Sequence, residues 1–213
     1  MVMGVFMSLD AMSLDALFEE LKHPNPNLRD RASLDIAEKR DETTVPRLMG
    51  LIAHENVDLR RSAVKTLGVI GVDAIPALTR GLKSDDVAMR TSCCKALAQL
   101  AGNFPDEELP SDTITALKLG AGDENAMVQL VSVMALGQLG RAGFEPLTEV
   151  LRGTDDAAVG VAIVNALGSG GDERSIAVLQ ALTTDMTVDS YVRESAVSAL
   201  PRLDQMINYK KGW

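Results

Sequence analysis

Residues 58–71 read Asp58-Leu59-Arg60-Arg61-Ser62-Ala63-Val64-Lys65-Thr66-Leu67-Gly68-Val69-Ile70-Gly71. Apolar residues recur in this stretch at intervals of three and four, which is the period of a helix with one buried face. An acidic residue near the start and a glycine at the end are typical of helix termini. The stretch therefore predicts an amphipathic helix that stops at Gly71.

The same pattern returns in five other blocks of the chain. Seven residues after the position of Arg60, each block carries an aliphatic residue suited to burial: Ile36, Leu67, Leu97, Leu136, Leu167 and Leu200. These residues are 31, 30, 39, 31 and 33 positions apart, and the long interval contains residues 102–110, a proline-containing acidic segment typical of a loop. A period near 30 residues indicates a repeat array.

A shorter apolar segment precedes each block and is expected to form the first helix of a pair. Two of these segments carry an early proline, Pro46 and Pro76, at a position that a helix tolerates. Turn residues rich in Asp, Asn and Ser separate the two helices and can cap the second one. Helix pairs are expected at residues 14–39, 45–71, 75–101, 111–140, 144–168 and 174–205.

These pairs predict an all-α fold, because no single pair can cover its own apolar face and neighbouring pairs must stack into a solenoid. We expect one solenoid over residues 13–207, a disordered leader at 1–12 and a flexible tail at 208–213. The leader is apolar, but it is too short to cross a membrane and lacks the basic start of a signal peptide. No membrane span is predicted.

Composition and charge narrow the classes of function. A hydrophobic content of 46% is sufficient for a sizeable core, and only 3% of the residues are aromatic, which suits helices packed through small side chains. The formal charge of −9 repels a phosphate backbone, so nucleic acid is not an expected partner. Cys93 and Cys94 are the only cysteines, too few for a disulfide framework, and a reducing, cytoplasmic location fits best.

On its repeat motif the sequence resembles the PBS-lyase HEAT-like repeat proteins, with their D-x-V-R-x-x-A and A-L-G-x-I-G patterns. The matching stretches are residues 58–71, Ala135-Leu136-Gly137-Gln138-Leu139-Gly140 and Asn165-Ala166-Leu167-Gly168. The resemblance covers nearly the whole chain and implies a HEAT-repeat α-solenoid. It points to cyanobacterial members related to the E/F-type phycobilin lyases and to the HEAT protein that partners iron–sulfur carriers.

The resemblance implies two functions of different classes. The first is a non-catalytic scaffold or chaperone of the phycobilisome pathway that holds a client protein, either a phycobiliprotein subunit or an iron–sulfur carrier, on its concave face. The second is a phycobilin lyase, or a lyase subunit, that attaches or detaches a bilin on a phycobiliprotein cysteine. A lyase of this kind acts by holding the bilin and the cysteine together, so proximity replaces a conspicuous catalytic residue. A purely structural adaptor in larger machinery is a third alternative.

The residues themselves predict no catalytic or metal site. Cys93 and Cys94 occupy repeat positions held elsewhere by alanine and valine, so both thiols should be buried and unreactive. Only His54-Glu55 matches the His-Glu pairs of the deoxyhypusine hydroxylases, another HEAT architecture, and His23 lies in a separate turn. No cofactor is expected, apart from a bilin under the lyase alternative.

The concave face of the array is the expected working surface. The second helices should line it, each with the residues that lie one, five and nine positions after its arginine position. The predicted protein-binding residues on this stripe are Arg61, Lys65, Lys95, Gln99, Leu130, Met134, Gln138, Val161, Asn165, Glu194 and Arg202.

An apolar centre formed by Leu130, Met134 and Val161 distinguishes this stripe, because exposed apolar patches tend to bind partners. The alternative is a different helical phase, in which these three residues belong to the core. Pairs four and five also carry Gln129 and Gly160 where four other pairs carry arginine. This departure predicts a more pliable middle of the stack, or else reflects drift.

Overall fold

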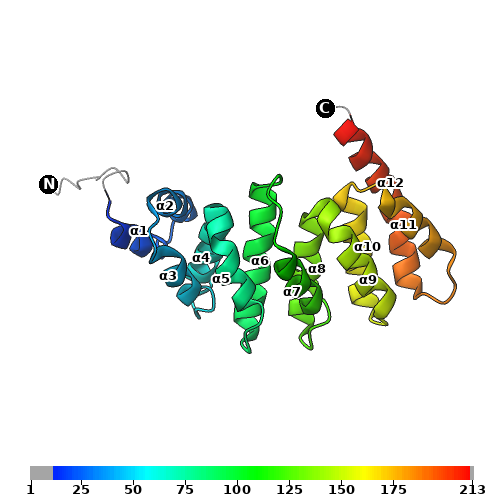
Figure 1. The fold of residues 1–213 in the computed structure, drawn as a ribbon, viewed down its shortest axis with the longest axis horizontal. Helices are drawn as coiled ribbons and strands as arrows, with labels where there is room; N and C mark the ends of the chain where they lie inside the picture. The colour runs from blue at the N-terminus through cyan, green and yellow to red at the C-terminus, as the bar shows by residue number, and fades with distance from the viewer. Residues whose placement is uncertain (1–11, 212–213) are drawn as a thin grey trace.

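A computed structural model describes residues 12–211 of the chain. Within this range the protein is a row of stacked helices with no strand, which runs from α1 at the left to α11 at the right of Figure 1. The elements are α1 (Leu14–Glu20), α2 (Pro26–Lys39), α3 (Thr44–Leu51), α4 (Val57–Ile70), η2 (Gly71–Ala74), α5 (Ile75–Gly81), α6 (Val87–Asn103), α7 (Ser111–Gly120), α8 (Ala126–Gln138), η3 (Gly140–Gly143), α9 (Phe144–Gly153), α10 (Ala157–Gly170), α11 (Arg174–Thr184) and α12 (Ser190–Lys211).

The α-helices form six consecutive pairs, α1–α2 to α11–α12, which we number one to six. This arrangement confirms the predicted all-α solenoid and its repeat period. α12 continues through residues 208–211, beyond the boundary predicted at 207, and residues 1–11 of the predicted leader lie outside the described residues. The proposed domain boundaries stay a prediction.

Each of the second helices α2 to α10 begins at an Asn or Asp whose side chain accepts a hydrogen bond from a backbone N–H of the first turn. The capping residues are Asn25, Asn56, Asp86, Asn125 and Asp156. These caps confirm the role predicted for the turn residues, because such side chains satisfy N–H groups that have no partner inside the helix.

Three glycines at or after the ends of second helices adopt positive φ angles: Gly71, Gly140 and Gly171. Gly71 follows the last residue of α4, as predicted from the sequence, and Gly171 follows Gly170, the last residue of α10. A residue with a side chain is strained at positive φ, so the residue that actually leaves the helix, Gly171, is the one that must be glycine here.

The core runs through the whole stack as one hydrophobic cluster. Ile36, Leu67, Leu97, Leu136 and Leu167 are buried as the repeat predicts, whereas Leu200 is only partly buried. Leu200 lies in the last pair, where no described pair follows to cover it, as expected for the end of a solenoid.

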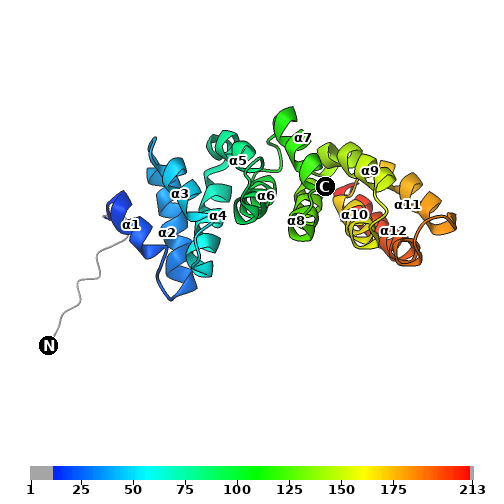
Figure 2. The ribbon, with the colours of Figure 1, turned by 90° about the horizontal axis from the view of Figure 1, so that it is seen from below.

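Second helices pack on one another more extensively than first helices do. Glycines make this close approach possible: a Cβ on Gly137 would lie 2.9 Å from the Ala166 side chain, and one on Gly168 would lie 2.8 Å from that of Ala199. Because the second-helix layer is tighter, the stack arches toward it, and Figure 2 shows the second helices along the inside of the arch. The prediction that they line the concave face is confirmed.

Candidate functional site

The eleven predicted binding residues all lie on second helices, from α4 to α12, and none of them is buried. Arg61, Lys95, Met134, Gln138, Glu194 and Arg202 are exposed, and the other five are partly exposed. Met134 is exposed, as the helical phase taken from the repeat predicts, whereas Val161 is partly buried and packs against the core cluster. The role of the eleven residues in binding stays a prediction.

Two methionine side chains of α8 are exposed on the concave face. Met134 is 63% exposed, and Met127, two turns earlier on the same helix, is 54% exposed. Leu130 lies between them and is partly exposed. Met127 lies two positions before the arginine position, outside the predicted stripe, which begins one position after it. The three side chains form one stripe at helical spacing, which we call the α8 stripe.

The predicted cations of the concave face are partly neutralised. The Lys65 ammonium lies 2.6 Å from Asp30 Oδ1 of α2, so its charge is satisfied inside the array. Arg61 and Lys95 are exposed and form no ion pair within residues 12–211. Two cations therefore flank the α8 stripe on its N-terminal side.

A shallow hollow of about 580 Å³ lies between α10 and α12 on the same face. Its lining includes four of the predicted residues, Val161, Asn165, Glu194 and Arg202, together with Tyr191, Ser195 and Ser198. Arg202 Nη2 donates to Asn165 Oδ1 at 2.7 Å, which ties the two helices and fixes the guanidinium beside the hollow. Tyr191 is 69% exposed and was not predicted, because it also precedes the arginine position.

The two thiols are buried, as the repeat predicts. Cys93 and Cys94 are both 0% exposed, and Cys94 Sγ lies 3.2 Å from Ser132 Oγ. Burial raises the pKa of Cys93 to about 12 and that of Cys94 to about 11. Because the thiolate is the nucleophile, neither residue can act as an activated cysteine in this state.

Both histidine side chains accept a hydrogen bond from the backbone of the turn in which they lie. His23 Nδ1 accepts from the backbone N–H of Asn25, and His54 Nδ1 accepts from that of Asn56, each at 3.0 Å. No group of three His, Cys, Asp or Glu side chains in the described part of the chain could hold a metal ion. The histidines are thus accounted for by local structure.

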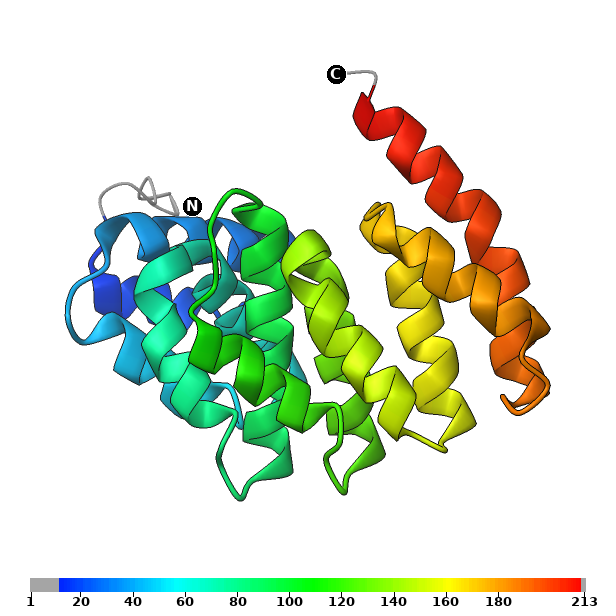
Figure 3. The same cartoon turned by 45° about the vertical axis from the view of Figure 1, so that its right-hand side comes forward.

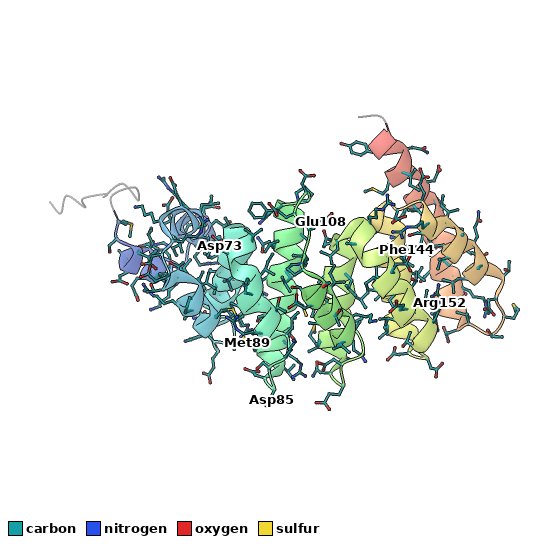
Figure 4. The ribbon with its side chains drawn as sticks, viewed as in Figure 1. Asp73, Asp85, Met89, Glu108, Phe144 and Arg152 are labelled. Atoms are coloured by element: carbon teal, nitrogen blue, oxygen red, sulfur yellow. The ribbon has the colours of Figure 1, made fainter. Side chains whose placement is uncertain are left out.

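A larger cavity of about 890 Å³ lies on the outer side of pairs five and six, away from the concave stripe. It is lined by α9 and α11, by the turns at 154–157 and 185–189, and by Gly160 and Val192 of the second helices. Gly160 departs from the repeat pattern in the sequence, but a cavity beside it was not predicted. Figure 4 labels Arg152, one of its lining residues.

The segment Val57–Gly81 is long and apolar enough, by length and composition alone, to cross a membrane. However, 61% of the apolar window is buried inside the solenoid, and η2 divides the segment into α4 and α5. The hydropathy of this segment is explained by its packing in the core.

Known protein families match this chain in two segments that agree with the helix pairs. The model of the HEAT repeats family matches residues 14–98 and 114–201, and the break between them coincides with the inserted loop before α7. The "uncharacterized phycocyanin operon protein Z" of Pseudanabaena tenuis is 43% identical over 94% of this chain and 100% of its own length. The "bilin biosynthesis protein CpeZ" of Synechococcus sp. is 33% identical over 63% of this chain and 76% of its own.

Among solved structures, a designed armadillo repeat protein in complex with a (KR)4 peptide aligns over 90% of this chain and all of its own, with a TM-score of 0.50. The sequences are 15% identical, so this likeness concerns the fold alone.

Proposed function

This chain belongs to the HEAT-repeat family, and on that premise we propose that it is a non-catalytic scaffold or chaperone that holds a phycobiliprotein subunit on its concave face. The two curated relatives carry names from the phycocyanin operon and from bilin biosynthesis, which supports a client from the same pathway. Neither name refers to an iron–sulfur carrier, so that client is left out of the proposal. A cytoplasmic location is part of the proposal.

The α8 stripe is the observation that carries this function. Met127 and Met134 are more than half exposed at the centre of the concave face, where they contribute little to the stability of the fold. Methionine is flexible and polarisable, so a methionine surface can adapt to the shape of a partner. Exposed apolar side chains gathered on one face favour a protein-binding role.

The concave face also has polar groups that can orient a client. Arg61 and Lys95 lie on α4 and α6, and Glu194 and Arg202 lie on α12. An apolar centre with charged residues around it is the usual anatomy of a protein interface. Charges at the rim of such an interface mainly control specificity and the rate of association.

A direct binding measurement tests this function. The purified chain is titrated with a phycobiliprotein subunit that lacks its bilin, and binding is followed by calorimetry. Saturable binding that Met134→Glu weakens supports the proposal. A client that binds equally well to the wild type and to Met134→Glu contradicts it, as does the absence of binding to any subunit.

The alternative function is a phycobilin lyase or a lyase subunit, and the hollow between α10 and α12 is what favours it. A bilin carries propionate groups and pyrrole N–H groups, and the hollow presents Arg202, Glu194 and Tyr191 to them. Its volume of about 580 Å³ lies in the range of small-molecule sites. The absorbance spectrum of a free bilin should shift on mixing with the chain if this function is correct, and should stay unchanged if the chain is only a scaffold.

A further inference from the structure

The arginines of the repeat fasten each turn to the helix that follows it. In pair one, Arg29 Nη1 donates to the carbonyl oxygen of His23 at 2.7 Å. In pair three, Arg90 Nη1 donates in the same way to the carbonyl oxygens of Ser84 at 2.8 Å and Asp85 at 3.1 Å. The guanidinium therefore lies over two backbone carbonyls of its own turn.

The same guanidinium also reaches the turn of the next pair. Arg29 Nη2 lies 3.8 Å from Asp58 Oδ1 of pair two, and Arg90 Nε lies 2.8 Å from Asp123 Oδ2 of pair four. In these pairs an arginine fills the space between successive turns and joins carbonyl oxygens on one side to a carboxylate on the other.

In pair five this arginine position is Gly160, and the space beside it is the cavity of about 890 Å³. The carbonyl groups that correspond to those of Ser84 and Asp85 belong to Thr154 and Asp155, and both residues line the cavity. No arginine among the described residues donates to these two carbonyl oxygens. A side chain at position 160 would also be crowded, because a Cβ there would lie 2.8 Å from Val192 Cγ2.

Carboxylates surround the cavity and aliphatic side chains form part of its wall. Asp155, Asp156, Asp185 and Asp189 line it together with Arg152, and the charge of Arg193 on α12 also acts on Asp185. Hydrogen bonds from Thr187 lower the pKa of Asp185, so its carboxylate is charged at neutral pH. The aliphatic part of the lining includes Leu151, Val178, Leu182, Val188 and Val192. The cavity thus suits a cationic group on an apolar chain and repels an anion.

We propose that this cavity is a docking site for an arginine-bearing segment of a partner protein, whose guanidinium takes the place that Gly160 leaves empty. The template is the protein itself, because pairs one and three hold a guanidinium at the same register between carbonyl oxygens and a carboxylate. Arginine is expected rather than lysine, because its planar fork of N–H donors can serve acceptors on two sides at once. Aliphatic neighbours of the arginine would contact Leu151 and Leu182.

This site is separate from the concave face. None of its lining residues belongs to the α8 stripe or to the hollow between α10 and α12. The cavity and the hollow share only the helices α10 and α12, on which different residues line them. Failure of the proposed concave-face function therefore leaves this inference standing, and the reverse also holds.

The test uses the purified full chain, labelled with nitrogen-15, and three short peptides. The peptide Gly-Leu-Arg-Leu-Gly is compared with its lysine and citrulline counterparts at millimolar concentration. We expect the arginine peptide to shift amide signals at residues 154–160 and 185–192, and the citrulline peptide to shift none. Equal binding of the citrulline or lysine peptide, signals that move only on the concave face, or no shift at all would overturn the assignment.

Two variants sharpen the test. Asp155→Lys reverses one charge at the cavity, and Asp85→Lys makes the same change at the corresponding turn position of pair three, where Arg90 already occupies the site (Asp85 is labelled in Figure 4). Asp155→Lys should raise the Kd for the arginine peptide by roughly fivefold or more, and Asp85→Lys should raise it by less than about twofold. Equal effects of the two substitutions would contradict the proposal.

A third variant fills the site from within. Gly160→Arg combined with Val192→Ala, which removes the predicted clash, should abolish peptide binding, whereas Val192→Ala alone should retain it. The helical circular dichroism of both variants checks that they are folded. A folded double variant that binds the peptide as the wild type does would contradict the inference.

Discussion

Arg90 Nη2 donates to Asp123 Oδ1 at 2.9 Å, across the boundary between pairs three and four. The Nε atom of the same guanidinium lies 2.8 Å from Asp123 Oδ2 as a charge contact without hydrogen-bond alignment. Both side chains are largely shielded from solvent, at 11% and 13% exposure. This pair fastens two repeats to each other through side chains as well as through the core.

The Arg90–Asp123 pair predicts a pH-dependent stability. Burial alone would raise the pKa of Asp123, but hydrogen bonds from Arg90 and from the backbone N–H of Asn125 lower it below its ordinary value of 3.8. A lowered carboxylate pKa stabilises the folded state above the unfolded pKa, and this contribution is lost as pH falls through the folded pKa. Asp123→Asn should therefore lower Tm at pH 7, and its Tm should converge with that of the wild type below about pH 3.8.

The control for this prediction is Asp106→Asn, because Asp106 is exposed in the inserted loop. Its Tm should follow that of the wild type at every pH. A Tm difference between Asp123→Asn and the wild type that is unchanged at acid pH would show that the carboxylate charge is not the source of the effect.

The buried thiols predict a specific chemical behaviour. At pH 8 both cysteines are protonated, because burial raises the pKa of Cys93 to about 12 and of Cys94 to about 11. Native protein should show almost no reaction with Ellman's reagent, and denatured protein should release two equivalents of thiol. Fast labelling of the native protein would mean that α6 opens readily or that the pair is exposed.

Glycine substitutions separate packing from helix propensity. Gly168→Ala places a Cβ 2.8 Å from the Ala199 side chain, so overpacking should lower the free energy of unfolding by about 1–3 kcal/mol. A Cβ at Gly50 in α3 would meet no atom within 4 Å. Gly50→Ala should therefore raise the free energy of unfolding by at most about 1 kcal/mol, through helix propensity alone. Urea unfolding measures both changes. A stabilising Gly168→Ala would contradict the close contact between α10 and α12.

Much of the fold could be predicted from the sequence because each pair repeats the same local signals. Asn56 and Asp86 mark helix starts, Gly71 marks a helix end, and Leu67 and Leu97 recur at the buried position. Each of these signals acts within a few residues of the chain, so a single sequence contains it. The helical phase was predictable for the same reason, and Met134 is exposed as expected.

The rest of the site depends on contacts between pairs, which local periodicity does not encode. The salt bridge from Lys65 to Asp30 joins residues of two different repeats, so the neutralisation of Lys65 could not be predicted from the local pattern around it. The cavity beside Gly160 needs the turn of pair six to close it. Gly160 was visible as a missing arginine, but the space it leaves appears only when pairs five and six are stacked.

The α8 stripe predicts a separation of stability from binding on one helix. The double substitution Met127→Glu, Met134→Glu replaces exposed side chains. The free energy of unfolding should therefore change by only about 0.5 kcal/mol per site. Leu136→Ala on the same helix removes a fully buried side chain and should cost about 2–5 kcal/mol. α8 is labelled near the middle of the stack in Figure 1, and Figure 3 shows the same stack turned, so local unfolding of α8 would disturb both flanking pairs. Thermal and urea unfolding of the two variants provide this comparison.

The affinity of the Met127→Glu, Met134→Glu double variant for a bilin-free phycobiliprotein subunit is the most direct test of the proposed function. Loss of interface anchors costs roughly 2 kcal/mol or more each, so Kd measured by calorimetry should rise well beyond tenfold while helix content stays that of the wild type. A folded double variant with unchanged Kd would contradict the account, because the client would then bind elsewhere than the concave face.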